Sequence, residues 1–115
     1  MFQFELDNAL LNVSNKLNSQ IVELISQKKR SISVAESITS GLIFNSILSM
    51  DRLKKYCIGG VVCQHVRSYI TLAGVCPTTY KDAGLKGSLV AIEMAQGVKE
   101  KSQSDIGLGV YGMVM

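Results

Sequence analysis

The stretch that most constrains the fold is residues 31–41, which read S-I-S-V-A-E-S-I-T-S-G. A short β-branched run with Ile32 and Val34 ends at Ala35, and small polar residues then lead into a new apolar segment. This order predicts a strand, a tight turn and the start of a helix. Such a turn directs backbone N–H groups and hydroxyls toward one point, which suits an anion or an acyl-transfer centre.

Before this stretch, apolar residues spaced by three and four positions predict a long amphipathic N-terminal helix over about residues 5–27. Its apolar stripe consists of Leu6, Leu10, Val13, Leu17, Ile21 and Leu24. Lys28, Lys29 and Arg30 follow the stripe, where cations favour the helix dipole. We therefore expect this basic run to be a helix terminus rather than a binding patch.

The rest of the chain predicts alternating helices and strands. We expect strands over 31–35, 57–63 and 105–115, and helices over 39–49, 65–73 and 88–101, with a charged connection over 50–56 and a turn-rich segment over 75–87. The run 57–63 is short and β-branched, as is typical of a central strand, and its paired glycines, Gly59 and Gly60, indicate close packing.

Two of these helices have a predicted buried face. It consists of Leu42, Ile43, Ile47 and Leu48 in the first, and of Leu89, Ile92, Met94 or Ala95, and Val98 in the last, which Ser88 would cap. Alternation of this kind predicts a single α/β domain over residues 1–115, with a short, mainly parallel sheet. Three strands leave long sheet edges, so we also expect a homo-oligomer.

Length and composition exclude several classes of protein. With 115 residues, of which 47% are hydrophobic, the chain has room for one core. A net charge of +3 without interleaved aromatics does not indicate a nucleic-acid partner. An acidic N-terminus without a long apolar run predicts a cytoplasmic protein without a membrane partner. Cys57, Cys63 and Cys76 are odd in number and lack C-x-x-C spacing, so we expect buried thiols and no metal site.

Four motifs resemble the CinA C-terminal domain family, which includes the nicotinamide-nucleotide amidases. They are A-E-S-I-T-S-G from Ala35, G-G-V-V from Gly59, L-A-G-V from Leu72 and D-I-G-L-G-V from Asp105, and the match in order and spacing covers about residues 8–112. The resemblance implies a three-layer α/β/α domain. In active members it also implies hydrolysis of nicotinamide mononucleotide to nicotinate mononucleotide and ammonia, without a cofactor.

The resemblance places Ser37 at the family's nucleophile, but it implies a degenerate site. Tyr69 stands at the position of the family's lysine base, and Lys86-Gly87 replaces a V-S element. Tyr111 and Gly112 occupy the loop that helps to form the nucleotide site, after which further strands follow in the family, so we expect a shortened sheet. The implied ligand-binding positions are Glu36, Thr39, Ser40, Gly41, Gly59, Gly60, Gln64, Tyr111 and Gly112.

A serine nucleophile needs a base. Arg67 stays protonated, Tyr69 needs a large decrease in pKa, and His65 has a suitable pKa but precedes the family's lysine position by four residues. Two interpretations of the function stay open. The chain is either an inactive member that binds a nucleotide-like ligand or a partner, or an amidohydrolase that uses Ser37 with a rewired base.

Purely structural roles for the same residues also stay open. The hydroxyls of Ser37, Thr39 and Ser40 would cap a helix, the Glu36 carboxylate would accept N–H groups at that helix's N-terminus, and His65 would begin a helix.

Overall fold

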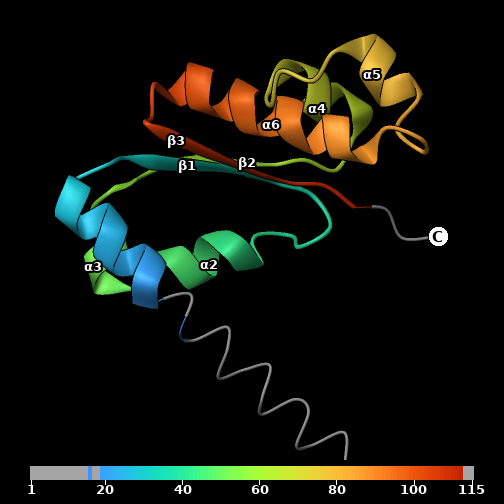
Figure 1. Cartoon of the computed structure of the whole chain (residues 1–115). Coiled ribbons are helices and arrows are strands. Elements are labelled where there is room, and N and C mark those ends of the chain that lie inside the picture. The colour runs from blue at the N-terminus through green and yellow to red at the C-terminus, as the bar shows by residue number, and fades with distance from the viewer. Residues whose placement is uncertain (1–15, 17–18, 113–115) are drawn as a thin grey trace, which may run out of the picture.

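The computed structural model describes residue 16 and residues 19–112 (Figure 1). Three parallel strands form one sheet in the order β2-β1-β3. The elements are β1 (Ile32–Glu36), α2 (Leu42–Leu48), α3 (Asp51–Lys54), β2 (Cys57–Val62), α4 (Val66–Thr71), α5 (Pro77–Lys81), α6 (Gly87–Ser102) and β3 (Ile106–Val110). The predicted α/β class with a parallel sheet is confirmed.

The sheet lies between two layers of helices (Figure 1). On one face α4, α5 and α6 cover the strands, and on the other lie α2, α3 and the helical residues 19–28. Successive side chains of β1 point to opposite faces. Ala35 therefore packs in one core cluster with Met94 of α6, whereas Val34 packs in the other with Ile25 and Ile47. All five residues of β1 are buried, as its central position requires.

Glycines allow the layers to approach to backbone contact. A Cβ atom at Gly107 or Gly109 of β3 would overlap the carbonyl oxygen of Ala95 or Ala91 of α6, respectively. A Cβ atom at Gly60 would overlap the Phe44 ring of α2 as well as the Val34 carbonyl oxygen of β1, which confirms the close packing predicted there. Gly59 has no such neighbour, but its φ of 143° is a conformation that favours glycine.

The structure differs from the prediction in which strand is central, and it contains two helices that were not expected. The central strand is β1 and not β2, whose outward residues Ile58 and Val62 are exposed. The apolar run of β2 therefore reflects burial of only one face of this strand. The predicted connection over 50–56 contains α3, and the turn-rich segment contains α5, which begins at Pro77. Strand β3 ends at Val110, and residues 113–115 of the predicted strand lie outside the described residues.

Both predicted helix faces were partly wrong. In α2, Ile47 is buried, but Leu42 and Leu48 are exposed. In α6 the fully buried residues are Val90, Met94, Gly97 and Val98, whereas Leu89 and Ile92 are exposed. The small residues of α6 that touch the glycines of β3 determine how this helix is rotated about its own axis. The spacing of apolar residues in the sequence does not reveal this contact.

The start of α6 also differs from the prediction. Its N-cap is Lys86 without a side-chain capping bond, so Ser88 is not the cap.

The predicted N-terminal helix falls largely outside the described residues. Residues 19–28 are helical, with Val22 and Ile25 buried, and the longest described helix is α6. The helix ends at Lys28 and Lys29 has a φ of 52°, which confirms the basic run as a helix terminus. Within the described part of the chain, no helix combines the length and apolar character needed to cross a membrane.

The prediction of buried thiols holds for one cysteine. Cys63 is buried, Cys57 is half-buried and Cys76 is exposed. Cys76 lies at the N-cap of α5, on the surface of the segment that was expected to be a loop.

Candidate functional site

The turn after β1 is organised around the Glu36 carboxylate, which is completely buried. Its Oε1 accepts hydrogen bonds from the Thr39 hydroxyl at 2.6 Å and from the N–H groups of Gly41 and Ile43 at 3.1 Å. Its Oε2 accepts the N–H of Phe44 at 2.9 Å. Burial on its own would raise the pKa of Glu36, but these hydrogen bonds outweigh it and hold the pKa below its ordinary value.

Glu36 therefore caps α2, as one interpretation of the sequence anticipated, and no hydroxyl of the turn does so directly. The N-cap residue is Gly41, with no side-chain cap of its own. Ser40 and Gly41 have φ angles of 53° and 96°, and the Ser40 N–H bonds to the Ser37 carbonyl at 3.0 Å. The N–H groups that the sequence offers to an anion are thus satisfied by a carboxylate of the chain itself.

Ser37 joins the ends of β1 and β3. Its side chain is 8% exposed, and its hydroxyl donates a hydrogen bond to the Val110 carbonyl at 3.1 Å. The N–H of Gly112 donates to Ser37 Oγ at 3.3 Å. The Ser37 proton is thus held by the Val110 carbonyl. Ser37 also interacts with the Tyr69 hydroxyl, and this interaction lowers the pKa of Tyr69.

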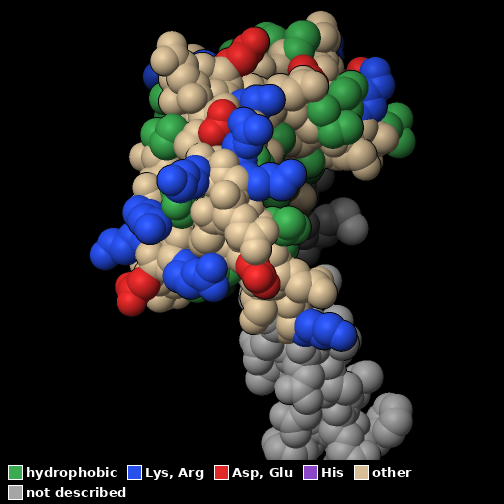
Figure 2. Space-filling view, turned by 60° about the vertical axis from the view of Figure 1, so that its left-hand side comes forward, with side chains coloured by type: hydrophobic (Ala, Val, Ile, Leu, Met, Phe, Trp, Pro, Cys, Tyr) green, Lys and Arg blue, Asp and Glu red, His purple; other side chains and the backbone are tan. Residues whose placement is uncertain are grey.

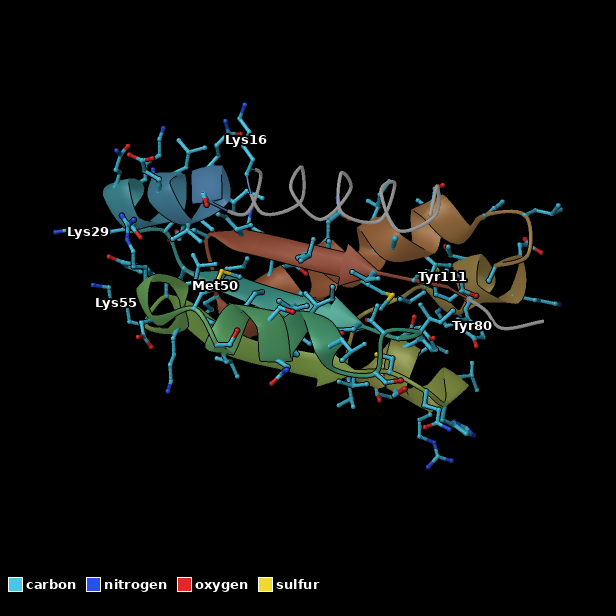
Figure 3. The ribbon with its side chains drawn as sticks, turned by 90° about the horizontal axis from the view of Figure 1, so that it is seen from below. Lys16, Lys29, Met50, Lys55, Tyr80 and Tyr111 are labelled. Carbon is cyan, nitrogen blue, oxygen red and sulfur yellow. The ribbon has the colours of Figure 1, made fainter. Side chains whose placement is uncertain are left out.

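Tyr69, Tyr80 and Tyr111 form a tyrosine cluster beside Ser37. The Tyr69 ring lies 4.9 Å from the Tyr80 ring and 5.8 Å from the Tyr111 ring, the second contact being edge to face. Figure 3 shows Tyr80 and Tyr111 at the end of the sheet where β3 finishes. The hydroxyl of Tyr111 is buried without a hydrogen-bond partner.

Burial raises the pKa of two of these tyrosines. For Tyr69, desolvation outweighs the hydrogen bond with Ser37, and the neighbouring Tyr80 and Cys63 add to the increase. For Tyr111, desolvation is again the main cause, with contributions from Tyr80 and Tyr69. A tyrosine whose pKa lies above its ordinary value near 10 is a poor general base at neutral pH.

The N-terminus of α6 adjoins the tyrosine cluster. A Cβ atom at Gly87 would lie 3.6 Å from the ring of Tyr111. Lys86 precedes it as the N-cap residue, with an exposed ammonium group 3.8 Å from the Asp82 carboxylate. The structure thus brings together Ser37, Tyr69, Tyr111 and Gly112 with the segment at residues 86–87. Sequence reasoning missed Tyr80, which lies in α5 and carries no motif.

The side chain of His65 and the N–H of Gln64 make their hydrogen bonds within the segment around α4. His65 is the N-cap of α4, and its Nδ1 accepts the N–H of Arg67 at 3.0 Å. The expected role of His65 as a helix-start residue is confirmed. Gln64 donates its N–H to the Ser68 hydroxyl at 3.2 Å and is exposed. A surface hollow of about 360 Å³ is lined by His65, Arg67, Ser68, Thr71 and Leu72.

Gly60 of β2 packs closely against its neighbours. Gly60 faces Val34 and Phe44. These two residues belong to the core cluster on the opposite face of the sheet from the tyrosine cluster. Gly41 lies near the end of β2, since a Cβ atom there would be 3.9 Å from Val62. Among residues 16 and 19–112, no three His, Cys, Asp or Glu side chains are grouped so that they could hold a metal ion.

The opposite end of the sheet carries charged residues with structural roles. Asp105, from the D-I-G motif, accepts the Ser31 N–H at 2.9 Å and lies 4.0 Å from Arg30. Hydrogen bonds from the backbone and the hydroxyl of Ser31 lower the pKa of Asp105. Figure 2 shows Lys and Arg side chains gathered on this side of the molecule. Asp105 therefore clamps the starts of β1 and β3 and does not belong to the site.

Comparison with known proteins matches this chain to one family. A sequence model described as the CinA C-terminal domain matches residues 14–114. Protein MG115 of Mycoplasma genitalium is 36% identical over 93 residues, which cover 81% of this chain and 59% of that protein. A CinA-like protein of Koribacter versatilis is 34% identical over 110 residues, which cover 95% of this chain and 27% of the relative.

A solved structure shares the fold. The crystal structure of a competence or damage-inducible protein from Enterobacter asburiae superposes with a TM-score of 0.68 at 19% identity, over 77% of this chain and 56% of that one. The chain therefore spans little more than half of the solved relative and of the Mycoplasma protein, and about a quarter of the Koribacter protein.

Proposed function

Since this chain belongs to the CinA C-terminal domain family, we propose that it is a member that binds a nucleotide-like ligand without hydrolysing it. The family's amidase reaction needs an activated serine and a base. The structure offers a serine at the corresponding position, but its surroundings favour a structural role.

The hydrogen bonding of Ser37 carries the proposal. Its hydroxyl donates to the Val110 carbonyl and accepts from the Gly112 N–H. A nucleophile must pass its proton to a base as it attacks, but this proton bonds to a carbonyl oxygen, which is not a base. Tyr69, at the family's lysine position, has a raised pKa, which makes it a poor base at neutral pH. Ser37 thus ties β1 to β3.

The neighbouring residues support ligand binding. In parallel α/β sheets, ligands bind at the carboxyl ends of the strands, and the tyrosine cluster lies at that end. Aromatic rings suit a planar heterocycle. The Lys86 ammonium and the first N–H groups of α6, a helix of 16 residues, suit a phosphate. In this proposal Glu36, Thr39, Ser40 and Gly41 hold the turn, and Tyr111, Gly112 and Lys86 adjoin the ligand.

The test measures reaction and binding separately with nicotinamide mononucleotide. We expect ammonia release no greater than that of a protein-free blank, and binding detectable by calorimetry. Lys86→Gln should weaken this binding, whereas Lys81→Gln, on α5, serves as the matched control. Ammonia release that Ser37→Ala abolishes would show an active amidase, and an absence of binding would refute the ligand.

A second candidate function rests on the contact between Tyr69 and Ser37. If ligand binding displaced the Ser37 proton from Val110, the Tyr69 hydroxyl would be the nearest group able to exchange it. This amidohydrolase would react with an aryl sulfonyl fluoride at Ser37, and Tyr69→Phe would abolish the labelling. His65→Ala should have no effect, because His65 bonds to the backbone of its own helix. Folded protein that stays unlabelled at pH 8 would exclude this candidate.

A further inference from the structure

The amino ends of the three strands lie at one end of the sheet, because the strands are parallel. The Ile32 N–H bonds to the Tyr56 carbonyl at 2.9 Å, so the chain before β1 lies beside the chain before β2. Both of these segments are basic. Their cationic residues, which we call the basic end, are Lys28, Lys29, Arg30, Arg52, Lys54 and Lys55. Figure 3 shows Lys29 and Lys55 at this end of the sheet and Tyr111 at the opposite end.

The basic end is more strongly charged than the chain as a whole. Residues 28–30, 51–55 and 105, which lead into the three strands, contain six of the twelve Lys and Arg residues and two of the nine Asp and Glu residues. Six cations and two carboxylates give these segments a net charge of +4, whereas the whole chain carries +3. All six cationic residues are exposed. The net charge of the whole chain therefore conceals a one-sided distribution.

Contacts within the chain explain only part of this charge. Arg30 lies 4.0 Å from the Asp105 carboxylate. Lys28 ends the helical residues 19–28 and Lys29 follows it, where cations favour the helix dipole. The three cationic residues within 52–55 belong to α3, a helix of only four residues, and to its C-cap. Among the residues that the structure describes, none of these three forms an ion pair. An exposed surface of one sign attracts a partner of the opposite charge.

We propose that the basic end binds the phosphate backbone of double-stranded DNA without reading its sequence. A duplex presents one negative charge per about 1.7 Å of its axis, whereas an extended acidic peptide presents at most one per about 3.3 Å. The duplex therefore places more charge against a surface of this kind. Four of the six residues are lysines, which bind phosphate as point charges without bidentate geometry, and this suits a repeating backbone.

A single strand fits this surface less well. Proteins that bind single strands stack the bases on exposed aromatic rings. The one aromatic residue of these segments, Tyr56, is half-buried, and Lys55 Nζ lies 5.3 Å from the centre of its ring. This ring is thus engaged with an ammonium group of the chain, and phosphates are the part of DNA that the basic end can contact.

Fluorescence anisotropy of the full chain with a short labelled duplex, at several salt concentrations, tests the binding. Each ammonium group that contacts a phosphate contributes about −0.9 to the slope of log K against log salt concentration. Lys28→Gln and Lys54→Gln, one from each basic segment, should each make this slope shallower by about 0.9, and together by about 1.8. Arg67→Gln combined with Lys81→Gln removes the same charge from α4 and α5, and should leave the slope unchanged. A wild-type chain without salt-dependent binding, or equal effects of the two double variants, would overturn the proposal.

Competition experiments distinguish the duplex from other polyanions. An unlabelled duplex of unrelated sequence should displace the probe as well as the original sequence does, because no base is read. Single-stranded DNA of the same length should displace it less. Poly-L-glutamate that competes equally at the same charge would indicate a surface for acidic proteins, and binding to phosphatidylserine vesicles in place of DNA would indicate a membrane surface. Either of these results, or unequal displacement by the two duplexes, would refute the proposal.

Discussion

The carboxylate of Glu36 and the backbone N–H of Phe44 lie 2.9 Å apart, which ties the end of the central strand to the first turn of the next helix. Together with Gly41 and Ile43, Phe44 turns the N-terminus of α2 toward an internal anion. The stretch that first suggested an active-site turn therefore bonds its N–H groups to a carboxylate of its own. The chemistry of this carboxylate leads to two measurable consequences.

Glu36→Gln should destabilise the protein by about 2–3 kcal/mol, because hydrogen bonds to charged groups contribute more than neutral ones and the amide would direct a donor at other donors. Urea denaturation measures the change. Glu100→Gln, at an exposed position of α6, is the control and should stay within about 0.5 kcal/mol of wild type. Equal effects of the two substitutions would show that the buried contacts of Glu36 contribute little.

The same group makes stability depend on pH. Because the pKa of Glu36 is lower in the folded protein than in the unfolded chain, the unfolded chain binds more protons at acid pH. The stabilisation is therefore complete well above the unfolded value of about 4.3 and is lost as the pH falls through the folded pKa. The urea midpoints of wild type and Glu36→Gln should move closer together as the pH is lowered from 7 to 3. A constant difference would contradict this assignment.

Gly97→Ala should destabilise the protein although alanine favours helices by about 1 kcal/mol. A Cβ atom at Gly97 would overlap the carbonyl oxygen of Ala73, so α6 and the segment after α4 would have to separate. We expect a net loss of about 1–3 kcal/mol in thermal unfolding. Gly84→Ala, where a Cβ atom has open space, is the control. A Gly97→Ala variant as stable as wild type would show that this contact relaxes freely.

Tyr69→Phe and Ser37→Ala should be coupled in a double-mutant cycle. Each removes one partner of the interaction by which Ser37 lowers the pKa of Tyr69, so the second substitution should cost less once the first is present. We expect a coupling energy of about 0.5–1.5 kcal/mol from urea denaturation. Additive effects would mean that the two hydroxyls do not interact in solution.

The three thiols should react in a fixed order with iodoacetamide at pH 7.5. Cys76 is exposed, and hydrogen bonds from the Thr78 side chain and from the backbone of Thr78 and Thr79 lower its pKa. Burial raises the pKa of Cys63 and Cys57. Because the thiolate is the nucleophile, peptide mass spectrometry should find Cys76 modified first and Cys63 last. Early modification of Cys63 would indicate that the core opens readily.

Local patterns were sufficient to predict the fold class and the main strands. The β-branched run at Ile32 and Val34, followed by the polar turn, identified β1, and alternation with helices predicted the parallel sheet. Which strand is central was not predictable, because β1 and β2 are both short and apolar. The difference arises from pairing at long range, with β1 joined to both neighbours.

The candidate site was predictable only where a motif marks it. Ser37, Tyr69, Tyr111 and Gly112 converge, and the Gly112 N–H bonds directly to Ser37 Oγ. Tyr80 joins them through the packing of α5, which no sequence pattern reveals. Exposure of Leu89 and Ile92 was likewise unpredictable, because the glycines of β3 are twelve or more positions away in the chain and yet determine how α6 rotates.

The contact between α6 and β3 also has a mechanical consequence. Backbone touches backbone at Gly107 and Gly109, without side chains that could rearrange between the two elements. Helix and strand therefore cannot slide past each other and must shift as one rigid lever. One end of this lever is the start of α6 at Gly87, against Tyr111, and its side is β3, the end strand of the sheet in the described residues. Any displacement at one place is thus transmitted to the other.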